Sequence, residues 1–128
     1  MMSHNTLTRI WLIAGWGMIA LVWYLCLIPA PPQLDINHAD KLEHAATYMF
    51  LMLWFAQLQP PRRRRQVIMW GLITMGIAIE FAQKATGYRS FDMWDMLANG
   101  TGAVLGMLLS HTMLGRLLPG QQRHATAD

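Results

Sequence analysis

Long apolar blocks alternate with short polar segments along the chain, and this pattern predicts four helices. Folded as a helix, an apolar block of about 20 residues crosses the roughly 30 Å hydrocarbon core of a membrane. Prolines, arginines and glycines interrupt the apolar pattern between the blocks, as expected for connectors. We therefore expect membrane helices at residues 7–28, 40–58, 67–83 and 92–118.

The composition supports a membrane protein rather than a soluble one. Apolar residues make up 54% of the 128 residues and charged residues only 13%, an unusual balance for a soluble domain of this size. We expect no cleaved signal peptide, because the first apolar block exceeds a normal signal sequence and no A-x-A site precedes the prolines. The expected fold is one all-α domain, an integral membrane four-helix bundle over residues 1–118, followed by a polar, disordered cytoplasmic tail at 119–128.

The basic residues predict the orientation in the membrane. Pro60 and Pro61 precede four consecutive arginines, residues 62–65, and short loops rich in arginine stay in the cytoplasm. With four alternating helices both termini are then cytoplasmic, and Arg9 and Arg116 agree with this assignment. We interpret the arginine run as a membrane anchor beside anionic lipid and not as a nucleic-acid site.

The expected helix at residues 92–118 has a polar start followed by a stripe of small residues. Ser90 or Asp92 is placed to cap its first turn. Small residues at every fourth position let two helix backbones approach closely. The stripe is therefore predicted to be a packing surface and not a ligand site, and it consists of Ala98, Gly102, Gly106 and Ser110.

Polar residues at helical spacing begin the second and fourth expected helices and end the third. Residues three or four apart share one face of a helix. These three helix ends lie on the same side of the membrane, so we expect their side chains to converge on an outward-facing site. The expected ligand-binding residues are Asp40, Lys41, His44, Tyr48, Glu80, Gln83, Arg89, Asp92, Asp95 and Asn99.

The same residues form three motifs in the order and spacing of a known family. The motifs are Asp40-Lys41-x-x-His44-x-x-x-Tyr48, Glu80-x-x-Gln83 and Arg89-Ser90-x-Asp92-x-x-Asp95-x-x-x-Asn99-x-x-Gly102. Over residues 7–118 the chain resembles the VanZ-like family of small bacterial multi-pass membrane proteins. The resemblance implies a protein of the bacterial cytoplasmic membrane and cell envelope. Some relatives are linked to resistance to teicoplanin-type glycopeptide antibiotics, but the family brings no settled biochemical activity.

Two kinds of chemistry fit the expected site. In the favoured hypothesis it binds an anionic envelope component, with Lys41 and Arg89 holding a phosphate or carboxylate. In the alternative the protein is an enzyme acting on a lipid-linked headgroup, with His44, Asp40 and Glu80 as candidate acid–base residues. The sequence offers no recognisable nucleophile or known catalytic motif, so whether it is an enzyme stays undecided.

A third hypothesis gives the charged residues a purely structural role. Arg89 would pair with Asp92 or Asp95, and Lys41 would pair with Glu80, locking the bundle together.

No metal and no other cofactor are expected, although possible metal ligands are present. A zinc site needs three protein ligands, but His38 lies in a connector, and Asp40 and His44 can form a hydrogen-bonded pair one turn apart. The full set of possible ligands is His38, Asp40, His44, Glu80 and Asp95. The expected partners are membrane lipids, an envelope lipid or peptidoglycan precursor, and a second copy of the chain, with no nucleic acid.

Overall fold

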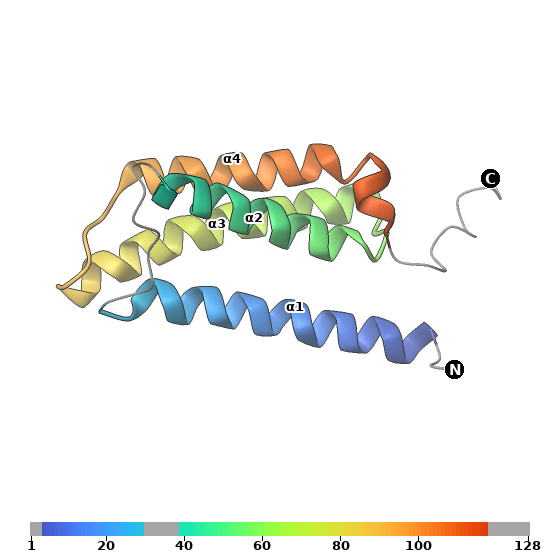
Figure 1. Cartoon of the computed structure of the whole chain (residues 1–128), viewed down its shortest axis with the longest axis horizontal. Helices are drawn as coiled ribbons and strands as arrows, with labels where there is room; N and C mark the ends of the chain where they lie inside the picture. The colour runs from blue at the N-terminus through green and yellow to red at the C-terminus, as the bar shows by residue number, and fades with distance from the viewer. Residues whose placement is uncertain (1–3, 30–38, 118–128) are drawn as a thin grey trace.

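The computed structural model describes residues 4–29 and 39–117, and all regular structure in these residues is helical. The elements are α1 (His4–Leu27), α2 (Ala39–Ala56), α3 (Arg62–Thr86), α4 (Met93–Leu109) and a short 3-10 helix, η1 (Met113–Arg116) (Figure 1). The expected all-α fold with four helices is confirmed. The expected tail at 119–128, most of the proline-rich connector and His38 lie outside the described residues.

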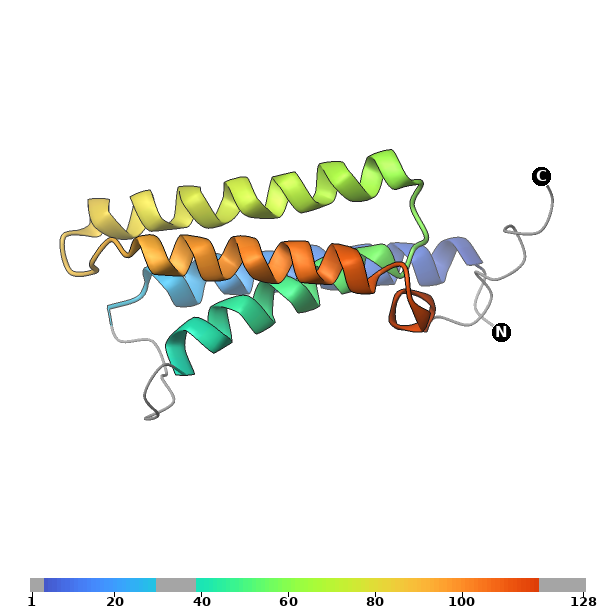
Figure 2. The same ribbon diagram turned by 90° about the horizontal axis from the view of Figure 1, so that it is seen from above.

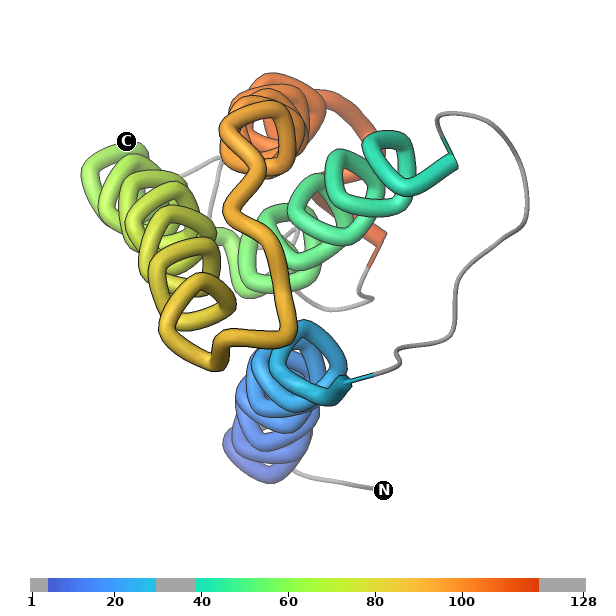
Figure 3. The backbone as a smooth tube through the Cα atoms, turned by 90° about the vertical axis from the view of Figure 1, so that its left-hand side faces the viewer, coloured from blue at the N-terminus to red at the C-terminus, as the bar shows by residue number. Residues whose placement is uncertain are grey.

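The bundle is built around α2, α3 and α4, with α1 alongside. α2 packs most extensively against α4, and α1 contacts both α2 and α3; Figure 3 shows this arrangement end-on. The starts of α2 and α4 and the ends of α1 and α3 lie at one end of the bundle (Figures 1 and 2). We call it the site end, and the opposite end, which carries η1, the η1 end.

Two helix boundaries differ most from the expected ones, the start of α3 and the end of α4. α3 begins at Arg62, five residues before the expected start at 67, because arginine favours helices and Pro61 supplies the extended residue before the first turn. α4 ends at Leu109 and the chain then turns into η1, so the expected helix end at 118 is too late. Gly87, with φ of 79°, closes α3 in the left-handed conformation that suits glycine.

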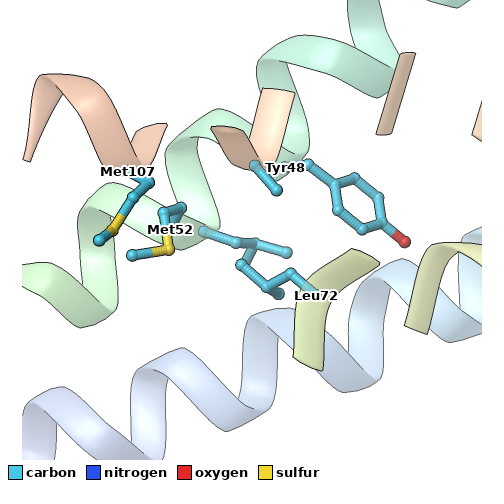
Figure 4. Packing of buried hydrophobic residues seen from close by; sticks show 6 residues of the cluster. Tyr48, Met52, Leu72 and Met107 are labelled. Atoms are coloured by element: carbon cyan, nitrogen blue, oxygen red, sulfur yellow. The ribbon is translucent and has the colours of Figure 1, made fainter. Parts of the chain in front are cut away.

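The small residues of α4 bring its backbone against α2. A Cβ atom on Gly102 would overlap the Ala45 carbonyl, and one on Gly106 would lie 2.7 Å from the Met49 carbonyl oxygen. The predicted packing role of these two glycines is confirmed. The apolar core (Figure 4) is formed by Tyr48, Leu51, Met52, Leu72, Ala103 and Met107.

Polar contacts hold α1 to the bundle near both of its ends. The rings of Trp11 and Trp54 stack with centroids 3.7 Å apart, and each indole N–H donates to the other residue's carbonyl, at 2.8 and 3.1 Å. At the site end, Gln83 Nε2 donates to the Cys26 carbonyl at 2.9 Å and the Tyr88 hydroxyl donates to the Leu27 carbonyl at 2.6 Å. The sequence pattern gave no sign of these pairings.

Two helices are long and apolar enough to cross a membrane, α1 over Asn5–Leu27 and α3 over Arg62–Thr86. α4, with 17 residues, and α2, with 18, are shorter. Large apolar side chains are nevertheless exposed on all four helices, for example Ile13, Phe50, Trp70 and Leu108. So much exposed apolar surface is typical of a protein that contacts lipid or other apolar partners.

Candidate functional site

The beginnings of α2 and α4 face each other at the site end, and their polar side chains form a cluster. Its members, which we call the polar cluster from here on, are Asp40, Lys41, His44, Asp92, Asp95 and Asn99. At its centre, Lys41 Nζ lies 3.0 Å from Asp40 Oδ2 and 2.6 Å from Asp92 Oδ2, and it also pairs with Asp95 Oδ1. One ammonium thus joins three carboxylates, one from α2, one from the residue that caps α4 and one from α4 itself.

His44 is the second centre of the cluster. Its Nδ1 lies 2.9 Å from Asn99 Oδ1, and because an amide oxygen only accepts, Nδ1 carries a proton in this arrangement. The other nitrogen, Nε2, faces Asp40 Oδ1 at 3.6 Å and Asp95 Oδ2 at 3.5 Å. The ring is therefore held between α2 and α4 by three polar neighbours.

Asp92 connects the cluster to α3. It caps α4, since its Oδ1 accepts from Trp94 N at 2.8 Å, and its own N–H donates to Glu80 Oε2 at 2.9 Å. Its other carboxylate oxygen binds Lys41. Asp92 lies in the connector between α3 and α4. The hydrogen bonds that its carboxylate accepts from Lys41 and from the Trp94 N–H lower its pKa below the usual value.

Glu80, next to the cluster, and Tyr48, in the apolar core, are both buried. Within the described part of the chain, Glu80 Oε1 and the Tyr48 hydroxyl have no hydrogen-bond partner. Gln83 is also buried, and its side-chain amide donates a hydrogen bond to the Cys26 carbonyl of α1. Among the described residues, only Glu80 of these three predicted site residues is hydrogen-bonded to the cluster, by accepting from Asp92 N.

The structural-lock hypothesis named the wrong pairs. Lys41 pairs with three aspartates rather than with Glu80, because Asp40, Asp92 and Asp95 all lie within reach of its ammonium. Among residues 4–29 and 39–117, the Arg89 guanidinium forms no ion pair. Arg89 lies three residues before Asp92 in the same connector, with its N–H donating to Thr86 Oγ1 at 3.3 Å.

A mostly apolar groove adjoins the cluster on the surface between α2 and α4. It encloses about 470 Å³ and is lined by Lys41, Trp94, Leu97, Ala98 and Thr101. Lys41 is thus a member of both the groove and the polar cluster. A molecule with a polar head and an apolar chain has matching surfaces here.

A second polar contact network at the η1 end was not predicted. Gln57 Nε2 donates to the Leu114 carbonyl at 2.6 Å, and Arg65 Nη1 donates to the Ser110 carbonyl at 3.2 Å. The partners are 57 and 45 residues apart, so no local spacing could reveal them. Arg65 therefore binds the residue that caps the end of α4.

Comparisons with known proteins agree with the motifs of the cluster. A model of the VanZ/LLP1 family matches residues 4–114. An uncharacterized protein of the fission yeast Schizosaccharomyces pombe, C11E3.10, is 34% identical over 90 residues, which are 68% of this chain and 54% of that protein. The chain thus spans about half the length of this curated relative, and no solved structure matches it. Since the family model covers all four α-helices and every residue of the polar cluster, the chain belongs to the VanZ/LLP1 family.

Proposed function

We propose that the protein is a multi-pass membrane protein whose polar cluster binds the headgroup of an anionic envelope component. The component is a lipid or a lipid-linked peptidoglycan precursor. The observation that carries the proposal is the position of Lys41, which belongs to the polar cluster and also lines the apolar groove. When the headgroup of a lipid binds Lys41, its acyl chain lies along the groove beside Trp94, Leu97 and Thr101.

The charge of the site limits how an anion can bind. Lys41 already shares its charge among Asp40, Asp92 and Asp95, so it is a weak anion ligand by itself. Arg89 adds a guanidinium with no ion pair among the described residues, and a guanidinium can grip phosphate oxygens in two places. In the proposal, Lys41 and Arg89 therefore both serve the anionic group.

The proposed membrane topology has four spanning helices and both termini in the cytoplasm. The apolar side chains exposed on all four helices support it. The arginines at the start of α3 lie at the η1 end, where α1 also begins (Figure 1), so that end is cytoplasmic in the proposal. A location in the bacterial cytoplasmic membrane and a part in glycopeptide resistance rest on the family resemblance, and the yeast relative carries no stated activity.

Native mass spectrometry of the purified full chain in detergent tests lipid binding. The probes are phosphatidylglycerol and undecaprenyl phosphate, added separately to distinguish a bulk lipid from a precursor carrier. Leu97→Trp fills the groove, and Lys41→Met removes the ammonium. We expect either change to weaken the affinity for the lipid about tenfold, which corresponds to about 1.4 kcal/mol.

Leu108→Trp is the matched control for the groove, because Leu108 is also an exposed leucine of α4 but does not line it. Lys84→Met is the control for the charge, because Lys84 lies over the Phe91 ring and outside the cluster. Equal lipid retention by Leu97→Trp, Lys41→Met and wild type would overturn the proposed function.

A further inference from the structure

The spacing around His44 Nε2 is unusual for a hydrogen bond. Asp40 Oδ1 and Asp95 Oδ2 lie 3.6 and 3.5 Å from it, whereas N–H···O hydrogen bonds span about 2.7–3.2 Å. Three ligands at about 2.0–2.2 Å from a tetrahedral zinc ion are separated from one another by about 3.3–3.6 Å. His44, Asp40 and Asp95 each offer one ligand atom, and these three atoms lie within 4.8 Å of one another. We propose that His44 Nε2, Asp40 Oδ1 and Asp95 Oδ2 bind a divalent transition-metal ion, with zinc the best match.

Each proposed ligand is fixed by a second contact that leaves the metal position free. Asn99 Oδ1 accepts from His44 Nδ1, which directs the lone pair of Nε2 toward the two carboxylates. Lys41 binds Asp40 through Oδ2 and Asp95 through Oδ1, the oxygens opposite to those facing His44. Metal-binding histidines and carboxylates usually have such supporting partners. The ammonium therefore supports the ligands and does not take the ion's place.

Glu80 is a second polar group next to the cluster that points to a ligand. Its side chain is fully buried, and Oε1 has no hydrogen-bond partner within the described residues. Its other oxygen accepts from Asp92 N, which places the carboxylate against the α4 side of the cluster. A buried acceptor without a partner is costly. A water molecule bound to the ion is a donor of the kind that Oε1 lacks.

The donor set indicates the class of ion. One imidazole nitrogen and two carboxylate oxygens suit zinc and its neighbours in the first transition row, and three protein ligands leave a fourth position for water or a ligand. The charge of the cluster also suits a cation. The negative charge of its three carboxylates exceeds the positive charge of the single Lys41 ammonium to which they are paired.

This inference deepens the proposed function, on which its functional meaning rests. An ion at His44 adds positive charge for an anionic headgroup to that of Lys41, which is shared among three aspartates. The open coordination position is then the binding place of a phosphate or carboxylate oxygen.

Metal binding by the purified full chain in detergent tests the site. We expect one zinc ion per chain after equilibrium dialysis, and a tetrahedral visible spectrum when cobalt(II) replaces zinc. His44→Ala and Asp95→Asn remove a ligand and abolish both signals. Asn99→Ala removes only the support of the ring and weakens zinc binding about 10- to 100-fold.

Two controls lie outside the proposed ligand set. His111→Ala removes an exposed histidine at the η1 end, and Glu43→Gln removes a carboxylate next to His44 on α2. Both variants are expected to bind zinc like wild type. If His44→Ala or Asp95→Asn fails to fold, Asp40→Asn still tests the site. The Asp40 side chain is 48% exposed, so its replacement is not expected to prevent folding.

A wild-type chain that binds no zinc, or an Asp40→Asn variant that binds it as tightly as wild type, overturns the metal site. No lipid takes part in this measurement. Zinc binding without lipid retention therefore contradicts only the proposed function, and lipid retention without zinc binding contradicts only the metal site.

Discussion

At the scale of single residues, Asp92 has more roles than any other member of the polar cluster. One carboxylate oxygen caps α4, the other binds Lys41, and its N–H binds Glu80. The sequence predicted Asp92 as a site residue and offered Ser90 or Asp92 as the helix cap, because both precede an apolar helix; the structure assigns the cap to Asp92. The choice of Lys41 as its partner depends on how α2 packs against α4, and no local spacing contains that information.

The variant Asp92→Asn separates the charge of this residue from its capping role, because asparagine is also a good cap. The pKa of Asp92 is lowered in the folded protein, so its charge stabilises the fold above the unfolded pKa of about 3.9, and this contribution is lost as the pH falls through the folded pKa. We expect wild type to unfold at a higher temperature than Asp92→Asn at pH 7. Circular dichroism at pH 7 and below pH 3 measures the difference, which should shrink in acid.

Asp92→Ala removes the cap as well as the charge, and we expect a further loss of about 1 kcal/mol relative to Asp92→Asn. The same thermal unfolding measurement applies. A difference between wild type and Asp92→Asn that does not change with pH would contradict the role assigned to the Lys41 pair.

At the scale of helices, the approach of α2 to α4 sets the geometry of the site. At Gly102 the backbone of α4 packs against the Ala45 carbonyl of α2. Ala45 directly follows His44 of the polar cluster. The spacing of small residues predicted this close approach, since it is a property of one helix face. It did not predict where α4 ends, because that end depends on contacts such as Arg65 with the Ser110 carbonyl.

Gly102→Ala and Gly100→Ala form a matched pair on α4. A Cβ on Gly102 overlaps the Ala45 backbone, whereas one on Gly100 has nothing within 4 Å. We expect Gly102→Ala to destabilise the protein by about 1–3 kcal/mol and Gly100→Ala to stabilise it by about 0.5–1 kcal/mol. Thermal unfolding in detergent compares the two. Equal effects would show that α2 and α4 do not approach closely at Gly102.

At the scale of the whole molecule, alternating apolar blocks predicted the number of helices and the end at which their polar residues meet. The structure brings the starts of α2 and α4 and the end of α3 together, as expected. Tyr48 and Gln83, predicted for the site, lie instead in the apolar core and against α1. Helical periodicity identifies a polar position, but the neighbouring helices determine what that position faces.

Cysteine labelling in intact cells tests the proposed orientation. Ser90→Cys lies at the site end and Arg63→Cys at the η1 end, and both positions are exposed. In a Cys26→Ser background, we expect a membrane-impermeant maleimide to label Ser90→Cys from outside, and Arg63→Cys only after the membrane is opened. Labelling of both positions in intact cells would contradict the topology.

The attachment of α1 has a consequence for sequence tolerance. Three of the bonds that hold α1 end on its main-chain oxygens, those of Trp11, Cys26 and Leu27. A carbonyl oxygen is the same in every residue, so Gln83 and Tyr88 do not distinguish which side chains occupy positions 26 and 27. Substitutions at positions 26 and 27 that preserve the helix therefore leave the position of α1 unchanged. Cys26→Ser is accordingly expected to keep the native fold in the labelling experiment.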